Sequence, residues 1–421
     1  MTEIMELFPG ITLRCFRDSR FKQGCLSLQF VRVMDKEESA MNALIPNVLL
    51  RGTNAHPDLR AVTQRLDELY GAAVSPVVRR IGDYQTLGLY CGFMDDRFAL
   101  PGEAVLEPML AFLKELLLDS PLQDGGFLPE FVESEKKNLI ATIESERNDK
   151  RAYAMAQLLR TMAKEDSFGL PRMGTKEQVA AIDPRTLYDH YRTVLRTSPV
   201  HIFYVGSGAP EAIATLLKPL FAGLSRDCGD LPAQTALRDS GGEDVTQTLE
   251  VSQGKLCMGF VTSITNRDPE FPAMQLLNTV LGAGMTSKLF MNIREKMSLC
   301  YSIGSGYYGT KGIVTVSAGI DFDKEQTVRE EVMRQLDACR EGCITPEELE
   351  NARQALLSSL RGTHDAPGSI EGYYATAALS GMELTPDAYM AALEAVTPED
   401  VVAAAGTLRL HSTYFLKGGN Q

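Results

Sequence analysis

The two halves of the chain repeat one order of predicted elements. Each half begins with two strand-like segments, continues through two helical patterns and two more strands, and ends with a long helical stretch and a last strand. In the first half the predicted strands lie at 11–16, 25–34, 72–81, 83–94 and 199–206. In the second half they lie at 246–253, 255–264, 298–308, 312–320 and 412–418. This repeat indicates two related folding units.

Residue-level matches indicate that the repeat is a duplication. The segment YQTLGLYCGFMDD parallels KGIVTVSAGIDFD, which sets Gly92 against Gly319, and LPEFVESEKKNLIATI parallels TPEELENARQALLSSL. We therefore expect an N-terminal domain at 1–223 and a C-terminal domain at 246–421, joined by the Gly-, Asp- and Ser-rich linker 224–245. Because strands come in pairs separated by long helical runs, each half is predicted to be α+β, an antiparallel sheet covered by helices.

Composition limits the partners of the protein. The 421 residues carry a formal net charge of −13, which disfavours nucleic acid as the main ligand because phosphate contacts need clustered basic side chains. No apolar run has the length of a membrane span, and the start MTEIMELFPGITLRCF lacks the pattern of a signal peptide. We expect a cytoplasmic protein that binds neither nucleic acid nor membrane. The eight cysteines form no C-x-x-C pair, and we expect them to be reduced and buried.

The common catalytic motifs are absent from the sequence. The five histidines form no H-x-x-E-H, H-E-x-x-H or H-x-x-x-H pattern, so no pair of histidines can hold a metal on one helix. Neither G-x-S-x-G nor a phosphate-binding G-x-x-x-x-G-K-[ST] loop occurs. An enzyme that acts through some other site therefore has little support.

One segment, 278–309, places two polar side chains where they could act together. It reads NTVLGAGMTSKLFMNIREKMSLCYSIGSGYYG, and a predicted helix at 286–297 carries Arg294 near its end, while Tyr301 opens the next strand. A guanidinium and a phenol both donate hydrogen bonds, so the two could converge on one carbonyl oxygen. From spacing alone, a surface arginine and a half-buried tyrosine explain the pattern better.

Part of this segment, LGAGMTSKLFMNIREKMSLCYS, closely resembles the second-half signature of the insulinase and pitrilysin-type zinc peptidases, family M16, in which LG-G-MSS-LF--IRE--GL-YS recurs. The resemblance extends to the duplicated halves, to LLRGT in the first half and to the EK pair at 135–136. It implies two LuxS/metallohydrolase-like domains in a clamshell arrangement. It also implies that Arg294 and Tyr301 hold the substrate backbone near the scissile bond, with Gly282 and Gly284 in the same substrate-binding motif.

The zinc-binding motif of that family is not conserved in residue type here. The family's zinc helix reads H-x-x-E-H and ends in K/R-G-T, which aligns it with the predicted helical segment ALIPNVLLRGT at 43–53. The first ligand His falls on Ala43, the catalytic Glu on Pro46, the second His on Asn47 and the third ligand, a Glu, on Thr142. Neither Ala nor Thr can replace a zinc ligand, and Pro cannot accept a proton from metal-bound water. We therefore expect no metal, no cofactor and no peptidase activity from this chain alone.

In two-chain members of the family, one chain supplies zinc and base while the other supplies the Arg/Tyr pair. The resemblance therefore predicts a non-catalytic bacterial subunit of a heterodimeric zinc metallopeptidase. Such a subunit would bind and position unfolded peptide for a homologous partner that carries H-x-x-E-H. The alternative is a proteolytically inactive structural or peptide-binding homologue with no role in hydrolysis. A homodimer of the isolated chain is compatible with both hypotheses.

Overall fold

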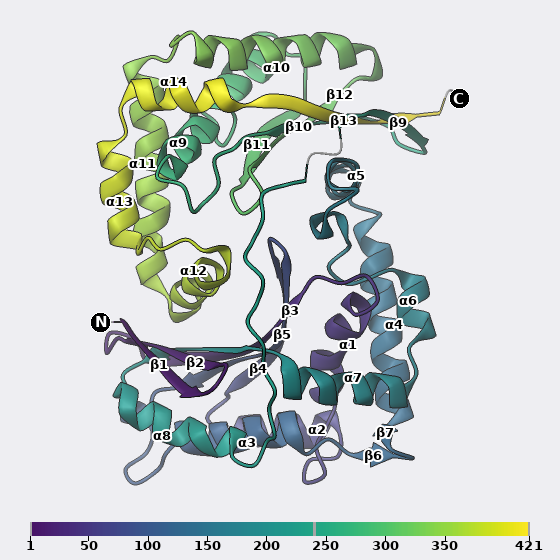
Figure 1. Cartoon of the computed structure of the whole chain (residues 1–421), viewed down its shortest axis with the longest axis vertical. Coiled ribbons are helices and arrows are strands. Elements are labelled where there is room, and N and C mark those ends of the chain that lie inside the picture. The colour runs from purple at the N-terminus through teal and green to yellow at the C-terminus, as the bar shows by residue number, and fades with distance from the viewer. Residues whose placement is uncertain (1, 239–240, 420–421) are drawn as a thin grey trace. The chain divides into compact units, whose positions relative to one another are not determined.

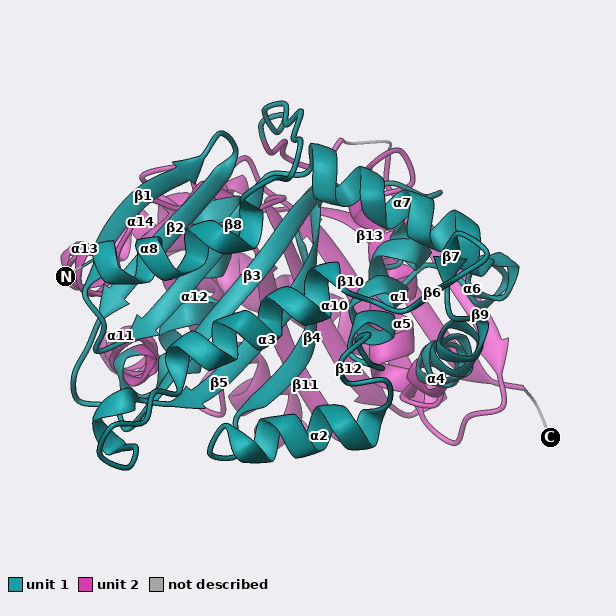
Figure 2. Cartoon of the chain, turned by 90° about the horizontal axis from the view of Figure 1, so that it is seen from below, with its two compact units in different colours: residues 1–144, 171–233, 364–379 teal, residues 145–170, 234–363, 380–421 magenta. Residues whose placement is uncertain are grey.

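The chain forms two compact units, and neither is continuous in sequence. The computed structural model describes residues 2–238 and 241–419 (Figure 1). Unit 1 consists of Met1–Glu144, Pro171–Ala233 and His364–Leu379. Unit 2 consists of Ser145–Leu170, Gln234–Thr363 and Ser380–Gln421. Figure 2 colours unit 1 teal and unit 2 magenta.

Unit 1 contains a six-stranded sheet with the order β1-β2-β8-β3-β5-β4. Its strands are β1 (Thr2–Phe8), β2 (Ile11–Arg17), β3 (Gln23–Val33), β4 (Ala73–Ile81), β5 (Tyr84–Met94) and β8 (Val200–Gly206), and a separate hairpin is formed by β6 (Leu122–Gln123) and β7 (Gly126–Phe127). Its helices are α1 (Ser39–Leu49), α2 (Leu59–Glu68), α3 (Leu106–Leu118), most of α4 (Pro129–Glu146), α6 (Lys176–Ala181), α7 (Pro184–Thr197), α8 (Pro210–Phe221) and α12 (Pro367–Ser380).

Unit 2 contains a five-stranded sheet with the order β11-β12-β10-β13-β9. Its strands are β9 (Asp244–Leu249), β10 (Gly254–Val261), β11 (Ser302–Tyr308), β12 (Ile313–Ile320) and β13 (Arg409–Gly418). Its helices are α5 (Lys150–Met162), α9 (Phe271–Leu281), α10 (Glu325–Arg340), α11 (Pro346–Gly362), α13 (Pro386–Ala395) and α14 (Pro398–Thr407), together with a π-helix at Leu289–Lys296. None of the described helices is long and apolar enough to cross a membrane.

Both sheets have the same topology, which agrees with the predicted duplication. In each, the last strand of the half lies between two earlier strands, so that β8 separates β2 from β3 and β13 separates β9 from β10, and unit 1 differs only by the additional edge strand β1. The predicted α+β fold with mainly antiparallel sheets is confirmed, but each sheet contains one parallel strand pair. The inserted strand runs antiparallel to one neighbour and therefore parallel to the other, as seen for β2 with β8 and for β9 with β13. All other strand pairs in the described residues are antiparallel.

The main cores lie between one face of each sheet and helices of the same half. In unit 1, apolar residues of β3 such as Leu28 pack with α1, α3, α7 and α8, including Leu44 and Phe112. In unit 2, residues of β10 such as Met258 pack with α9, α10 and α14, including Leu277. These residues are buried, and their burial follows from the strand alternation and helical spacing that the sequence shows.

One helix of each half packs against the sheet that contains the strands of the other half. Helix α5, from the first half of the sequence, packs on β10 and β13 of unit 2, where Leu158 joins a core with Cys257 and Tyr414. Helix α12, from the second half, packs on strands of unit 1, where Ile370 joins a core with Phe203. Figure 2 accordingly draws α12 in the colour of unit 1. Each sheet thus receives one helix from the other repeat.

Buried ion pairs fix both exchanged segments. In unit 1, Glu371 of α12 accepts two hydrogen bonds from Arg79 at 3.0 and 2.9 Å and one from Ser27 at 2.6 Å. In unit 2, Asp166 lies just after α5, and its carboxylate is 2.9 Å from the Lys311 ammonium. The side chains of Lys311 and Asp166 are 0% and 2% exposed. A buried charge is costly without a partner, so each pair specifies where its segment packs.

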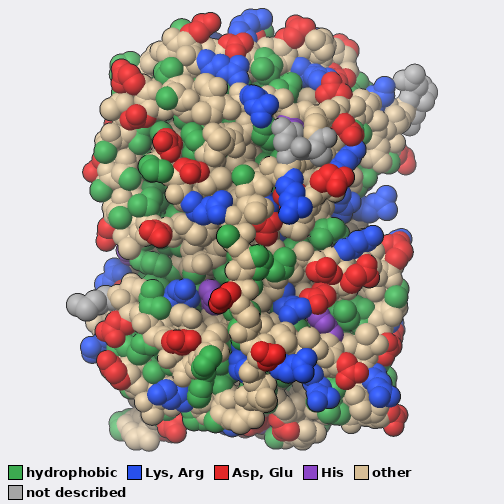
Figure 3. Space-filling model, in the orientation of Figure 1, with side chains coloured by type: hydrophobic (Ala, Val, Ile, Leu, Met, Phe, Trp, Pro, Cys, Tyr) green, Lys and Arg blue, Asp and Glu red, His purple; other side chains and the backbone are tan. Residues whose placement is uncertain are grey.

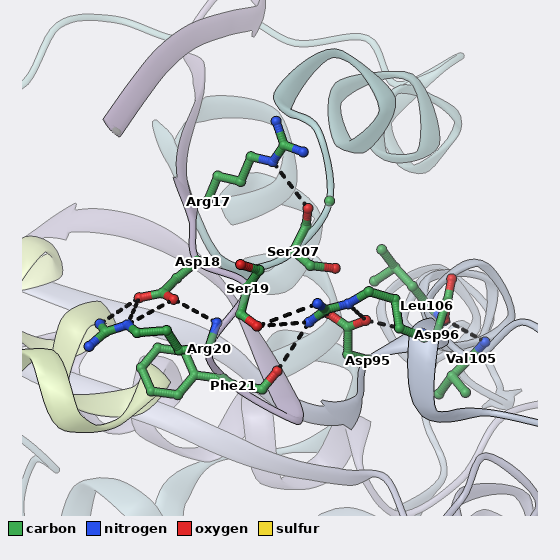
Figure 4. A network of polar contacts seen from close by, with 12 residues as sticks. Arg17, Asp18, Ser19, Arg20, Phe21, Asp95, Asp96, Val105, Leu106 and Ser207 are labelled. Carbon is green, nitrogen blue, oxygen red and sulfur yellow. Dashed lines mark hydrogen bonds and ion pairs between the residues drawn. The ribbon is translucent and has the colours of Figure 1, made fainter.

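A polar network joins the loops at one end of the unit 1 sheet (Figure 4). Arg97 donates to Asp95 at 2.8 Å and to the backbone carbonyl of Ser19 in the β2–β3 turn. The neighbouring Asp96 accepts from the backbone N–H of Leu106 at the start of α3. Because these carboxylates bind loops of their own unit, the network is structural. Elsewhere, acidic and basic side chains are interspersed on the face shown in Figure 3.

Candidate functional site

The helical segment that carries Arg294 is a π-helix, Leu289–Lys296, where an α-helix is predicted at 286–297. Its wider turn is seen where the N–H of Met297 donates to the carbonyl of Asn292 at 3.0 Å, five residues earlier. Leu289 and Ile293 are fully buried and hold the segment on the unit 2 core. Arg294, the next residue, therefore lies on the accessible side. π-Helical turns are rare and often occur at functional sites.

Arg294 links the π-helix to the start of β11. Its guanidinium lies over the Phe290 ring, 4.6 Å from the centroid, and its Nε donates to the backbone carbonyl of Tyr301 at 3.1 Å. One terminal nitrogen also donates to the Glu295 carboxylate at 2.8 Å. These contacts use two of five N–H groups, so the planar fork is held in orientation while donors remain for a further acceptor.

Tyr301 is 60% exposed and directly precedes β11. Its backbone N–H donates to Gly319, and its hydroxyl donates to Asp321 at 2.9 Å. This hydrogen bond raises the pKa of Tyr301, so the phenol keeps its proton at neutral pH and can act as a donor. The structure thus brings Arg294 onto the backbone of Tyr301, while the Tyr301 hydroxyl points to a carboxylate.

Asp321 is the residue of this site that sequence reasoning missed. It follows β12, whose Gly319 pairs with Ser302 of β11. That register places the residues after Gly319 beside the residues before Ser302, so Asp321 comes close to Tyr301. The hairpin pattern itself was visible in the sequence, but the register was not assigned.

Two glycines of the signature have different surroundings. A Cβ on Gly282 would lie 2.7 Å from the Ser305 hydroxyl and 2.8 Å from Leu289, so only glycine fits where the end of α9 meets β11. The Gly282 carbonyl also accepts from the N–H of Ser305 at 3.0 Å. Gly284 has open space around it, and its carbonyl accepts from the Ser287 hydroxyl at 2.6 Å. Gly282 therefore has a packing role, whereas Gly284 lies in an accessible turn.

Ser298 adopts φ of 52°, the left-handed region, at the position where the family signature has glycine. This conformation costs an L-residue roughly 1–2 kcal/mol of steric strain. Glycine has no such strain, but it loses more conformational entropy when the chain folds. We expect Ser298→Gly to raise the free energy of unfolding by up to about 1 kcal/mol, measured by urea denaturation. The control Ser358→Gly, at an exposed position inside α11, should lower it. A lower stability of the Ser298 variant would contradict this account.

At the positions that match the zinc motif, the side chains are buried in a helix or hydrogen-bonded to the backbone of their own helix. Ala43 is buried within α1, and Pro46 lies inside the same helix, where its ring removes one backbone hydrogen bond. Asn47 donates its side-chain N–H to the Ala43 carbonyl at 3.1 Å. On α4, the Thr142 hydroxyl donates to the Asn138 carbonyl at 3.0 Å. The residues at these positions therefore do not fit a zinc ion.

The segments that flank the altered motif still contact each other. Arg51 of the RGT end lies 3.3 Å from the Glu135 carboxylate of α4, which also accepts from Asn138 at 3.1 Å. Helix α1 is held from its other side by buried Asn42, which donates to Gln85 at 2.9 Å. Across the described ranges, no group of three or more His, Cys, Asp or Glu side chains could hold a metal. The helices that flank the altered motif therefore still pack together, although the residues that would bind zinc are absent.

Comparisons with known proteins agree with the resemblance seen in the sequence. A family model described as "Peptidase M16 inactive domain" matches residues 181–356. A "Probable inactive metalloprotease YmfF" of Bacillus subtilis is 28% identical over 418 residues, covering 99% of this chain and 98% of the relative.

Solved structures share the fold over the full chain. A conserved protein from Enterococcus faecalis superposes with a TM-score of 0.93 and 26% identity, covering 100% of this chain and 99% of the other. A structure from Pseudomonas fluorescens, described as a peptidase M16 inactive domain, has a TM-score of 0.82 at 17% identity, covering 100% of this chain and 98% of the other, and shows the fold alone.

Proposed function

We propose that this chain, an inactive relative of the M16 peptidases, serves as the non-catalytic subunit of a two-chain zinc peptidase. The observation that carries this proposal is the contrast between its two motifs. Arg294 and Tyr301 are present, accessible and linked by a 3.1 Å hydrogen bond, whereas Ala43 and Pro46 stand where a metal ligand and a base are needed. A homologous partner with H-x-x-E-H would supply the metal and the base.

In this model the chain binds and orients an unfolded peptide. Arg294 directs its remaining N–H donors at a carbonyl oxygen near the scissile bond, and its stacking on Phe290 keeps the fork in place. Tyr301 adds a phenolic donor when its hydroxyl turns from Asp321 to the peptide. The role is positioning and electrostatic, so it requires no metal on this chain.

The test is reconstitution with an H-x-x-E-H homologue encoded beside this chain. Each protein is purified alone and together, and cleavage of an unfolded fluorogenic peptide is followed for all three samples. We expect co-purification and cleavage by the pair only. Full activity of the partner alone would overturn the shared-site model.

A second candidate is an inactive structural or peptide-binding homologue. It is favoured by the fact that Arg294 and Tyr301 already have acceptors on their own chain, in Glu295 and Asp321. If these contacts are only structural, a Tyr301→Phe variant should lose stability while any complex with a peptidase keeps full activity. The same reconstitution, run with this variant, distinguishes the two functions.

A further inference from the structure

A cationic cluster lies on the unit 1 sheet, on the face opposite the main core. Arg14 of β2 contacts His201 of β8, with one guanidinium nitrogen 3.3 Å from the imidazole Nδ1. The guanidinium also lies over the Phe203 ring, 5.5 Å from its centroid. Parallel pairing of β2 with β8 sets Arg14 beside Phe203, so the contacts follow from the strand register. Alternate residues of the same strands, such as Leu13, point into the core.

Arg14 has no carboxylate partner in the part of the chain that the structure describes. Its contact with His201 is the only hydrogen bond that its guanidinium makes there. Some other arginines of unit 1 are paired with acids, as Arg32 is with Glu38 and Arg79 is with Glu371. Burial lowers the pKa of Arg14, which means that the charge is partly desolvated, and no carboxylate offsets that cost. A desolvated, uncompensated charge is costly for a fold, so it indicates a ligand of opposite charge.

His201 can add a second donor at the same place. Burial and the neighbouring Arg14 charge lower the pKa of His201 to about 4, so the imidazole is neutral at pH 7. A neutral ring that accepts through Nδ1 carries its hydrogen on Nε2. Arg14 and His201 thus offer N–H donors and one positive charge, which is a donor set suited to a carboxylate.

An exposed apolar side chain completes the cluster. Ile4 of β1 is the cross-strand partner of Arg14 and is 64% exposed, so the two side chains share one face as neighbours. Glu6, on the same strand, has a carboxylate that accepts from the N–H of Gly10 at 3.4 Å and forms no ion pair with Arg14. A ligand at this position therefore meets a cation beside an apolar surface.

We propose that Arg14 and His201 bind the C-terminal carboxylate of a peptide whose last side chain is apolar and rests on Ile4. The charge matches the guanidinium, the carboxylate oxygens match its donors, and the apolar side chain matches the exposed isoleucine. The site lies in unit 1 and is separate in chemistry from Arg294 and Tyr301. It goes beyond the proposed function, because it needs neither a partner chain nor hydrolysis.

The test measures peptide binding to the full chain without any partner, by fluorescence anisotropy. The probe is an unstructured labelled peptide ending in leucine, compared with its C-terminal amide and with an amide that carries an added internal glutamate. We expect amidation to weaken binding by roughly 10- to 100-fold, the range of a charge-assisted hydrogen bond, and the internal glutamate not to restore it. Equal binding of acid and amide overturns the site, and restoration by glutamate overturns the C-terminal assignment.

Variants assign the effect to Arg14. In Arg14→Gln, the acid should bind as weakly as the amide, whereas the matched control Arg17→Gln, an exposed arginine on the same strand, should keep the difference. Arg14→Gln should leave the free energy of unfolding unchanged or higher, because it removes a desolvated charge that has no carboxylate partner. A destabilised Arg14→Gln together with an unchanged acid-to-amide ratio would identify a structural arginine. Binding in this assay can succeed even if no partner is activated, so failures of the two proposals are distinguishable.

Discussion

Replacement of Arg294 by alanine is expected to lower peptide cleavage by the reconstituted pair by roughly 10²- to 10³-fold in kcat/KM, the usual cost of removing one preorganised donor at a reacting carbonyl. The arginine is oriented by Phe290 and by the Tyr301 carbonyl, so its remaining donors require little reorganisation. The measurement is steady-state cleavage of a fluorogenic peptide by the co-purified pair. Tyr301→Phe should have a smaller effect, because its hydroxyl must first leave Asp321.

Two variants on the same segment separate positioning from general damage. Arg294→Lys keeps the charge but loses the planar fork, so it should recover only part of the activity. Lys296→Ala removes an exposed cation that contacts Asn292 at 3.0 Å and should leave kcat/KM unchanged. The shared-site model fails if Arg294→Ala forms an intact pair with unchanged kcat/KM.

Much of the fold follows from periodicity and repetition. Strands such as β3, β5 and β12 show strong apolar patterns, and the second half supplied an independent copy of each signal. The strand β1 was not predicted, because its outward residues include the exposed Ile4 and its alternation is weak. The insertion of β8 and β13 between earlier strands was also not predictable, since a strand pattern indicates a buried face but not its neighbours.

The positions of α5 and α12 show a second limit. A helical pattern identifies which face of a helix is apolar, but it does not say which sheet receives that face. Only tertiary contacts, such as those of Leu158 with Cys257 and of Ile370 with Phe203, reveal the exchange. From the sequence, Glu371 and Asp166 could not be distinguished from other carboxylates, because the cations that they contact lie far away along the chain.

The sequence motif was enough to locate the site but not to predict its geometry. The spacing of Leu289 and Ile293 fits an α-helix and a π-helix equally well, so the wider turn that contains Arg294 was not predictable. The altered zinc motif was readable because its RGT end is kept, and the proline inside α1 is where the alignment places it. Arg14 escaped notice because an arginine in an alternating strand is normally assigned to the solvent face.

The Asp166–Lys311 pair gives the largest expected effect on stability. Asp166→Asn removes the carboxylate that lies 2.9 Å from the Lys311 ammonium, which is 0% exposed, and we expect the free energy of unfolding to fall by about 3–5 kcal/mol. The asparagine can still accept from the backbone N–H of Phe168, which donates to Asp166 at 2.8 Å, so the loss reports on the charge rather than on the turn. Urea denaturation of the full chain measures the difference, with Asp323→Asn, at a 76% exposed partner of Lys324, as the matched control.

A double variant, Asp166→Asn with Lys311→Met, separates two quantities. One is the contribution of the intact ion pair to the free energy of unfolding, and the other is the loss of stability when only one of its charges is removed. If the pair mainly specifies where the segment after α5 packs, removing both charges should recover most of the lost stability, because methionine fills the lysine site without a charge to solvate. Near-full recovery with unchanged proteolytic sensitivity of residues 145–170 would mean that the apolar contacts of α5, including Leu158, suffice to hold the exchange. A loss for Asp166→Asn below about 1 kcal/mol would contradict the view that a buried ion pair fixes this segment.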